Sequence, residues 1–358
     1  MRLAQLRLRD FRNYTRLDVN FEPGFHLLLG ANAQGKTNIL EAIYLMATLR
    51  SFRGVGSAQM VRHGEKGYFV GGTVVSQGEH QIKIYWSARE RNLTLDSRPV
   101  RKLTDYLGVL RTVVFCTEDL QLVKGTARAR RRFMDLLLSQ THPTYLPLLQ
   151  RYTQAVRSRN ALLKQPILNP EAIEGFSREL ITVGGEILRL RRELLPRLGP
   201  LAQRAYSRIA GGEAEELRLE YLPSVKNDFA VELAQARARE RAYRSTLIGP
   251  HRDDLQLLIA DRSAAQFSSE GQKRTLAIAL KMAQAEYLVG LHGVPPILLI
   301  DDIMGELDAN RRAGFLPLLE QAHQARGQVF MTATEANWPA ELGRDAVRWT
   351  VRAGKLER

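Results

Sequence analysis

The chain has 358 residues, of which 44% are hydrophobic and 25% are charged, and its one cysteine is Cys116. Such a composition is typical of a soluble globular protein with room for two domains, and a single cysteine excludes an internal disulfide. The single cysteine fits a reducing cytoplasm, where we expect the protein to lie. No membrane is expected as a partner, because no apolar run approaches the roughly 18 residues that a membrane span requires. The net charge of +14 favours a polyanionic partner, either nucleic acid or an anionic membrane surface, with a merely solvated basic surface as the alternative.

The N-terminal part predicts strands and one helix. Residues 2–9 and 14–21 alternate apolar and polar side chains, which is typical of two paired strands joined by a turn. A short apolar strand at 25–29 leads into a glycine-containing loop, and a helix follows from about 36 to 49. Further strands are expected at the following ranges: 68–75, 81–86, 91–95 and 111–116.

The loop after residue 29 matches the phosphate-binding pattern G-x-x-x-x-G-K-[ST] in full and lies between a predicted strand and a predicted helix. Its residues are Gly30, Ala31, Asn32, Ala33, Gln34, Gly35, Lys36 and Thr37. The two glycines let the backbone wrap closely around a phosphate, and the loop amides and the helix N-terminus face the anion. We expect Lys36 to reach the β- and γ-phosphates and the Thr37 hydroxyl to hold Mg²⁺, so the loop predicts ATP binding.

The middle of the chain, about 118 to 244, reads as mostly helical, with one probable strand at 217–222. Four prolines are expected to punctuate the helices: Pro166, Pro170, Pro196 and Pro200. Between Lys124 and Lys164 nine basic residues face a single acid, Asp135, so this segment carries +8 of the net +14. Five of its residues are candidate contacts to DNA phosphates: Lys124, Arg128, Arg130, Arg131 and Arg132.

Strand and helix patterns alternate again in the C-terminal part. Strands are expected at 255–259, 297–300 and 328–332, and helices at about 271–289 and 310–325. We therefore expect two sequence-distant halves, 1–117 and 246–358, to complete one α/β lobe around a helical insertion, 118–245.

Two carboxylates follow the apolar strand 297–300. Asp301 ends the strand at the edge where open α/β sheets bind ligands, so we expect it to act with Thr37 at Mg²⁺. Asp302 is placed to orient or deprotonate the attacking water. The candidate catalytic residues are thus Lys36, Asp301 and Asp302. By itself, an apolar strand followed by two acids is a weak signal, because turns of this composition are common.

The run Ser268-Ser269-Glu270-Gly271-Gln272 precedes the long helix. It is similar to the Ser-x-Gly-Gln signature of ABC-type ATPases, in which serine and glycine contact the γ-phosphate held by another subunit. The simpler interpretation is a helix N-cap formed by Ser268 or Ser269, and both interpretations can hold together.

Together these motifs resemble the RecF family, which looks like the head of an SMC chromosome protein without the long coiled coil. The resemblance rests on the opening LRLRDFRNYTRLDVNFEPG, on EDLQLVKGTARARRRFMD (118–135) and on LIGPHRDDL (247–255), and it spans about residues 1 to 334. It implies an α/β ABC-ATPase head, with a phosphate loop, mixed sheets and helices, and an inserted mainly helical second lobe.

The resemblance also implies site residues and partners. Arg12 and Asn13 would lie near the nucleotide, Asp308 would lie in the D-loop, and Ser269, Gly271 and Gln272 would complete the site of a second copy in an ATP-dependent homodimer. DNA is the implied partner, double-stranded and gapped, with single-stranded DNA as a further candidate. RecO and RecR are implied to act with it in the loading of RecA.

Some positions depart from the usual ABC pattern. Asp302 stands where Glu is usual, Gly305 replaces a serine before Asp308, and no switch histidine occurs in 331–337, so Thr332 or Thr334 must substitute or the role is absent. For the glutamine loop the candidates are Glu118 and Asp119. These departures predict slow hydrolysis, suited to a timing switch.

Several alternatives stay open at this point. His251 and Arg252 either form a structural turn or lie near the dimer interface. For the whole chain, an ATPase subunit of a transporter would share the phosphate loop and the signature, but it predicts a switch histidine and no basic helical lobe. A small-molecule phosphotransferase would need neither the signature nor the basic segment.

Overall fold

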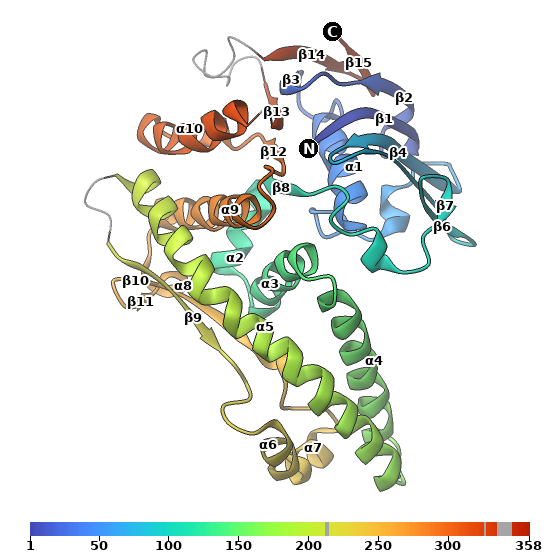
Figure 1. Ribbon diagram of the computed structural model, residues 1–358, viewed down its shortest axis with the longest axis vertical. Coiled ribbons are helices and arrows are strands. Elements are labelled where there is room, and N and C mark those ends of the chain that lie inside the picture. The colour runs from blue at the N-terminus through green and yellow to red at the C-terminus, as the bar shows by residue number, and fades with distance from the viewer. Residues whose placement is uncertain (212–214, 326, 335–345) are drawn as a thin grey trace. The chain divides into compact units, whose positions relative to one another are not determined.

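The computed structural model describes residues 1–211, 215–325, 327–334 and 346–358 (Figure 1). These residues form two compact units. The first contains 1–120, 204–214 and 274–358, and the second contains 121–203 and 215–273. The chain passes between the units more than once, and the long helices Pro170–Ala210 (α5) and Glu270–His292 (α9) each contribute residues to both units.

The first unit contains two sheets. The antiparallel sheet has the order β2-β1-β4-β5-β6-β7, and its strands are Arg2–Phe11 (β1), Tyr14–Asn20 (β2), Gly67–Val75 (β4), Glu79–Ser87 (β5), Arg91–Leu95 (β6) and Arg98–Pro99 (β7). The mixed sheet has the order β15-β14-β3-β13-β12-β8, and its strands are Gly24–Leu29 (β3), Thr112–Phe115 (β8), Ile297–Asp301 (β12), Gln328–Ala333 (β13), Val347–Arg352 (β14) and Lys355–Glu357 (β15). The helices of this unit are Lys36–Thr48 (α1), most of Glu270–His292 (α9) and Ala309–Gln324 (α10).

The mixed sheet joins the two ends of the chain. In Figure 1 the N-terminal strand β3 lies between the C-terminal strands β13 and β14, and it is parallel to both. The prediction that distant halves complete one sheet is therefore confirmed. Strands β14 and β15 were not predicted, because the sequence interpretation ended at about residue 334.

Helix α1 lies between the two sheets, since it contacts β4 of the antiparallel sheet and β12, β13 and β8 of the mixed sheet. Its side chains are accordingly buried nearly all round, from Ile39 and Leu40 to Leu45 and Met46. A helix enclosed on every side cannot shift easily, so the phosphate loop that opens it has a rigid base.

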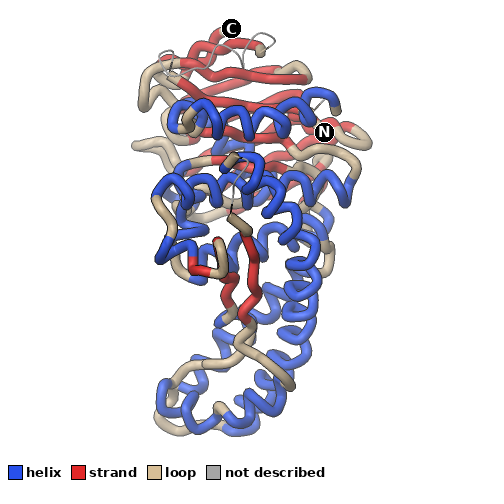
Figure 2. Tube along the Cα trace, turned by 90° about the vertical axis from the view of Figure 1, so that its left-hand side faces the viewer, coloured by secondary structure: helices blue, strands red, loops and turns tan. Residues whose placement is uncertain are grey.

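The second unit is mainly helical, as Figure 2 shows, and its strands form one small antiparallel sheet of order β11-β10-β9. The helices are Gln121–Lys124 (α2), Ala127–Thr141 (α3), Tyr145–Leu163 (α4), most of Pro170–Ala210 (α5), Phe229–Gln235 (α6), Arg237–Tyr243 (α7) and Ala264–Phe267 (α8). The strands are Leu217–Leu222 (β9), Asp254–Ile259 (β10) and Arg262–Ser263 (β11). Short 3-10 turns complete the described chain at Ser57–Met60, Leu103–Asp105, Thr117–Leu120, Pro250–Arg252 and Met304–Glu306.

Two details differ from the sequence interpretation. Residues 246–273 belong to the second unit, although we expected them in the ATPase lobe, because β10 pairs along its whole length with β9 of the insertion. Pro196 and Pro200 lie inside the continuous helix α5 and do not end it. The buried neighbours Leu194, Leu198 and Ala202 hold this stretch by packing, which offsets the hydrogen bonds that proline removes.

Among the described residues, no helix is both long and apolar enough to span a membrane.

Candidate nucleotide-binding site

The phosphate loop runs from the end of β3 to the first turn of α1. Gly35 has a φ of +115°, and a Cβ at this position would come within 2.7 Å of the Asn13 side chain. At Gly30 a Cβ would lie 2.4 Å from the carbonyl oxygen of Val351. Both positions therefore require glycine, because a Cβ there would collide with a neighbouring part of the chain.

Lys36 is largely buried under the loop. Its Nζ donates hydrogen bonds to the carbonyl oxygens of Gly30 at 2.6 Å and Ala31 at 2.9 Å. Burial lowers the pKa of the Lys36 ammonium from its ordinary value, and the negative charges of Asp302 and Asp301 oppose this shift. The Lys36 side chain thus reaches back to the start of the loop, and its ammonium lies near enough to two acids for their charges to raise its pKa.

Asp301 meets Thr37 at the end of β12. The Thr37 hydroxyl donates to Asp301 Oδ1 at 2.8 Å across 264 residues of sequence, as the predicted pairing requires. A second hydroxyl, that of Thr332 on the neighbouring strand β13, donates to the same oxygen at 2.8 Å. Burial raises the pKa of Asp301; the hydrogen bonds from Thr332 and Thr37 lower it, whereas the charges of Glu118 and Asp302 raise it further.

Asp302 lies just past the strand in a left-handed backbone conformation, with a φ of +55°. Its backbone N–H donates to the Thr332 hydroxyl at 3.0 Å. Oxygen ligands of this kind, the Thr37 hydroxyl and the Asp301 carboxylate, are those that Mg²⁺ prefers, so the residues present fit the predicted metal.

The turn before β2 supports the phosphate loop. The Asn13 side-chain amide donates to the carbonyl oxygen of Gln34 at 2.8 Å, and Asn38 donates to Asn13 Oδ1 at 2.8 Å. Arg12 does not point the same way: its guanidinium pairs with the fully buried Glu41 at 2.6 Å. Asn13 therefore contacts the loop itself, while Arg12 anchors the turn to helix α1.

The C-terminal hairpin supports the loop from another direction. The backbone N–H of Ala353 donates to Gln34 Oε1 at 2.7 Å, and that of Gly354 donates to the carbonyl oxygen of Gln34 at 3.1 Å. Sequence reasoning missed both residues, because a backbone amide carries no motif.

The two candidates for the glutamine loop differ in their surroundings. The Asp119 carboxylate accepts the Cys116 N–H at 2.9 Å and lies 3.7 Å from Lys281 Nζ. Burial raises the pKa of Asp119, and the charge of Lys281 lowers it. Glu118 lies near the nucleotide site, since its negative charge helps to raise the pKa of Asp301.

The signature residues begin helix α9. The Ser269 hydroxyl accepts the Gln272 N–H at 3.2 Å, and Gln272 Oε1 accepts the Ser269 N–H at 2.8 Å. This reciprocal pair is a capping box, and Gly271 lies within it in the first turn. In the first unit, Asp308 accepts the Arg311 N–H at 2.9 Å at the start of α10.

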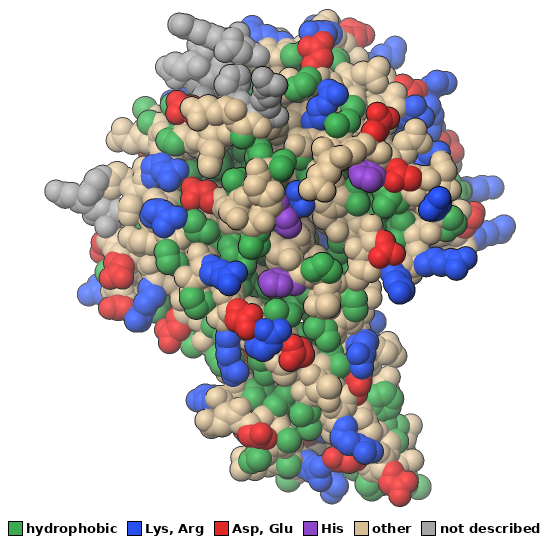
Figure 3. All heavy atoms as spheres, viewed as in Figure 1, with side chains coloured by type: hydrophobic (Ala, Val, Ile, Leu, Met, Phe, Trp, Pro, Cys, Tyr) green, Lys and Arg blue, Asp and Glu red, His purple; other side chains and the backbone are tan. Residues whose placement is uncertain are grey.

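The candidate DNA contacts separate into two groups. Arg130 forms a bidentate pair with Asp254 at 2.8 and 2.9 Å, and Arg131 donates to the carbonyl oxygen of Asp253 at 2.6 Å. Lys124 pairs with Glu270, whereas Arg128 and Arg132 have exposed side chains. Figure 3 shows acidic side chains interspersed among Lys and Arg on the visible face of the second unit.

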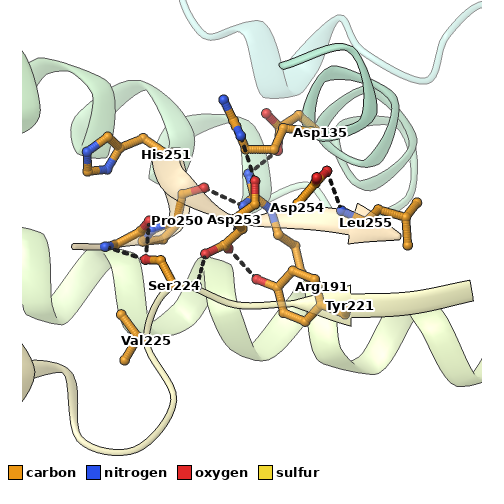
Figure 4. A network of polar contacts seen from close by, with 12 residues as sticks. Asp135, Arg191, Tyr221, Ser224, Val225, Pro250, His251, Asp253, Asp254 and Leu255 are labelled. Carbon is orange, nitrogen blue, oxygen red and sulfur yellow. Dashed lines mark hydrogen bonds and ion pairs between the residues drawn. The ribbon is translucent and has the colours of Figure 1, made fainter. Parts of the chain in front are cut away.

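The run 247–255 leads into a buried network, which Figure 4 shows. Asp253 pairs with Arg191 at 2.8 Å and accepts the Ser224 N–H at 2.8 Å and the Tyr221 hydroxyl. Arg191 also pairs with Asp135 at 2.7 Å. We call these five residues the Asp253 cluster.

His251 and Arg252 precede this cluster in the chain. The ring of His251 lies between the Tyr152 hydroxyl at 2.7 Å and the Thr246 carbonyl oxygen at 3.0 Å. The exposed Arg252 donates to the same carbonyl oxygen at 3.3 Å. The turn containing His251 is therefore structural within its own unit, as one of the two open alternatives supposed.

The chain is similar throughout its length to known proteins. The family model described as "RecF/RecN/SMC N terminal domain" matches residues 2–353. The DNA replication and repair protein RecF of Symbiobacterium thermophilum is 38% identical over 376 residues, covering 99% of this chain and 98% of that protein. The protein of the same name from Lactococcus lactis subsp. cremoris (strain MG1363) is 35% identical and covers 100% of this chain and 99% of its own length.

Solved structures also show the similarity to RecF. The structure of the "recombination mediator protein RecF-ATP in RecFOR pathway" is similar with a TM-score of 0.90 and 30% identity, over 99% of this chain and 96% of that one. An Smc head domain from Pyrococcus furiosus reaches a TM-score of 0.57 at 15% identity, which shows the shared ABC-ATPase fold alone.

Proposed function

The chain belongs to the RecF family, and we propose that it is an ATP-dependent DNA-binding protein of recombinational DNA repair, with slow ATP hydrolysis that resets it. The contact between the phosphate loop and a distant acid supports this most directly. Thr37 at the start of α1 meets Asp301 at the end of β12, and a loop of this kind serves to bind a nucleotide triphosphate.

The described residues support a site for ATP with Mg²⁺. The loop amides of 30–37 would hold the phosphates, and Lys36 would exchange its bonds to loop carbonyls for phosphate oxygens. Thr37 and Asp301 would hold Mg²⁺, which neutralises phosphate charge when it is bound. The similar solved structure is described as RecF-ATP, which supports ATP as the nucleotide.

Hydrolysis is assigned to Asp302. Its carboxylate follows the metal-binding position directly, and its charge reaches both Lys36 and Asp301. An Asp side chain is one methylene shorter than the Glu usual at this position, so the water would be oriented less favourably. We propose a weak, DNA-stimulated ATPase that acts as a timing switch.

ATP would also join two copies of the chain. We assign Ser269, Gly271 and Gln272 to the γ-phosphate of a second subunit, with Asp308 close to the same interface. The position of these residues supports this assignment, because they lie at the start of α9, and the N-terminus of a helix attracts anions. A two-fold dimer of this type would hold two nucleotides.

DNA is the proposed macromolecular partner, double-stranded and gapped, with junctions and single strands as further forms. The net charge of +14 supports a polyanion. The similar solved protein is described as a recombination mediator in the RecFOR pathway, from which we propose RecO and RecR as partners in loading RecA.

Fluorescence anisotropy of a gapped duplex, with and without ATP, tests the proposal. We expect ATP to tighten DNA binding by the wild-type protein and to have no effect on a folded Lys36→Met variant. Circular dichroism checks folding, and Lys355→Met, on the C-terminal hairpin, is the control for loss of a lysine. A protein that binds ATP but no form of DNA would contradict the proposal and favour the transporter-subunit alternative.

A further inference from the structure

In the described part of the chain, Thr332 is hydrogen-bonded to both acids of the proposed hydrolytic site. Strands β12 and β13 are parallel, and their register places Thr332 directly beside Asp301. The Thr332 hydroxyl donates to Asp301 Oδ1 at 2.8 Å and accepts the Asp302 N–H at 3.0 Å. Only 2% of the residue is exposed, so its side chain belongs to the interior.

The direction of these bonds follows from the groups involved. A backbone N–H can only donate and an ionised carboxylate can only accept, so the single hydroxyl proton points to Asp301 and a lone pair faces the Asp302 amide. One side chain therefore orients the carboxylate of Asp301 and the peptide that leads into Asp302. This peptide needs support, because Asp302 has a φ of +55°, a conformation that non-glycine residues adopt rarely.

The contact also bears on the absence of a switch histidine in the sequence. A switch histidine would reach from the end of this strand towards the nucleotide, and the chain has no histidine there. Thr332 does not replace such a group, since its hydroxyl faces the two acids and is buried. Its bond to Asp301 comes in addition to that of Thr37, which is itself a proposed Mg²⁺ ligand.

We propose that Thr332 is the positioning residue of the hydrolytic site. It holds Asp301 towards Thr37 and fixes the backbone of Asp302, so that one acid serves the metal and the other serves the water. This inference rests on the proposed function as an ATPase. A threonine that only fills the core would affect stability and leave the Mg²⁺ dependence and the hydrolysis rate unchanged.

The test compares Thr332→Val, which keeps shape and removes the hydroxyl, with Thr332→Ser, which keeps the hydroxyl. The matched control is Thr112→Val, since Thr112 is equally buried on β8 of the same sheet and its hydroxyl has no hydrogen-bond partner among the described residues. Affinity for a fluorescent ATP analogue is measured with Mg²⁺ and with EDTA, together with the hydrolysis rate and the melting temperature.

We expect Thr332→Val to lose about 10- to 100-fold in the Mg²⁺-dependent part of nucleotide affinity and in hydrolysis rate, as for groups that orient metal ligands. Affinity in EDTA should not change, Thr332→Ser should restore most of the loss, and Thr112→Val should behave as wild type. If Thr332→Val does not fold, Thr332→Cys replaces it, because a thiol is of similar size and a weak donor.

Two failures can be told apart. A folded Thr332→Val protein with wild-type hydrolysis and Mg²⁺ dependence would overturn the role of Thr332 and leave the proposed function intact. A wild-type protein that binds no ATP would instead overturn the proposed function.

Discussion

Two groups of charged side chains in the described chain, the Asp253 cluster and the phosphate-loop site, differ in what satisfies their charges. In the Asp253 cluster of the second unit, Asp253 and Arg191 are almost fully buried, and Ser224, Tyr221 and Asp135 occupy their remaining hydrogen-bonding positions. At the phosphate loop, Lys36 Nζ donates hydrogen bonds to two backbone carbonyls that a phosphate could replace, and Asp302 makes no hydrogen bond through its carboxylate within the described chain.

This difference separates structural motifs from ligand sites. The run 247–255 is one of the three segments that carry the resemblance to RecF, yet its acids are paired within the protein itself. The phosphate loop is a far more widespread pattern, and the bonds that Lys36 makes to the loop carbonyls are ones that a phosphate could replace. A sequence motif typical of one family is therefore weaker evidence for a ligand site than polar groups whose hydrogen bonds a ligand could replace.

The largest effect should come from Asp302→Asn, which removes the proposed water-orienting carboxylate. We expect ATP binding to persist and hydrolysis to slow by about 10²–10⁴-fold, as for the loss of a general base. Single-turnover hydrolysis alongside a binding titration measures both. Hydrolysis at the wild-type rate would show that Asp302 does not orient the water.

Asp253→Asn should have the next largest effect, on stability. It leaves Arg191 with one carboxylate in place of two, and loss of a partner from a buried ion pair costs about 3–5 kcal/mol. Asp261→Asn, which breaks the exposed pair with Arg218, should cost less than about 1 kcal/mol. Urea unfolding of the two variants compares them, and equal destabilisation would contradict the distinction.

Ser269→Arg should weaken the ATP-dependent dimer by at least about tenfold, or 1.4 kcal/mol. The larger, charged side chain would occupy the space next to the partner's γ-phosphate, and ATP binding to the monomer should persist. Light scattering with ATP, with ADP and without nucleotide measures the dimer. If the wild-type protein stays monomeric at saturating ATP, or if the variant dimerises normally, the proposed interface is wrong.

The basic segment should respond differently at its paired and exposed arginines. Arg128→Gln should weaken DNA binding for all sequences and flatten the slope of log K against log salt by at most about 0.9 for one phosphate contact. Arg130→Gln should lower stability and leave the salt slope unchanged, because Arg130 is engaged by Asp254. If Arg128→Gln left the salt slope unchanged and Arg130→Gln flattened it, Arg128 would not be a DNA contact.

The remaining prediction concerns pH. Burial lowers the pKa of His251 to about 4, and the bond to Thr246 opposes the shift. The unfolded chain, with a pKa near 6.5, then binds more protons in this range, so stability falls as the pH drops from about 6.5 to about 4. Urea midpoints at pH 7, 6 and 5 should show a steeper loss for wild type than for His251→Asn. Parallel curves would show that His251 does not carry this dependence.

The sequence by itself determined the local elements. The phosphate loop, the strand before it and the helix after it follow from residue types within about twenty positions, and so does the strand Leu217–Leu222, which lies where it was predicted. The capping alternative for Ser269 was also evident, because a cap acts within one helical turn.

Only the tertiary structure decided which distant groups meet. The register of β12 against β13 sets Thr332 beside Asp301, the β9–β10 pairing carries residues 246–273 into the second unit, and Arg130 finds Asp254 across 124 residues. The backbone amides of Ala353 and Gly354, which hold Gln34, have no sequence signature at all. Such contacts depend on strand order, register and burial, and these are properties of the whole folded chain rather than of any short window along it.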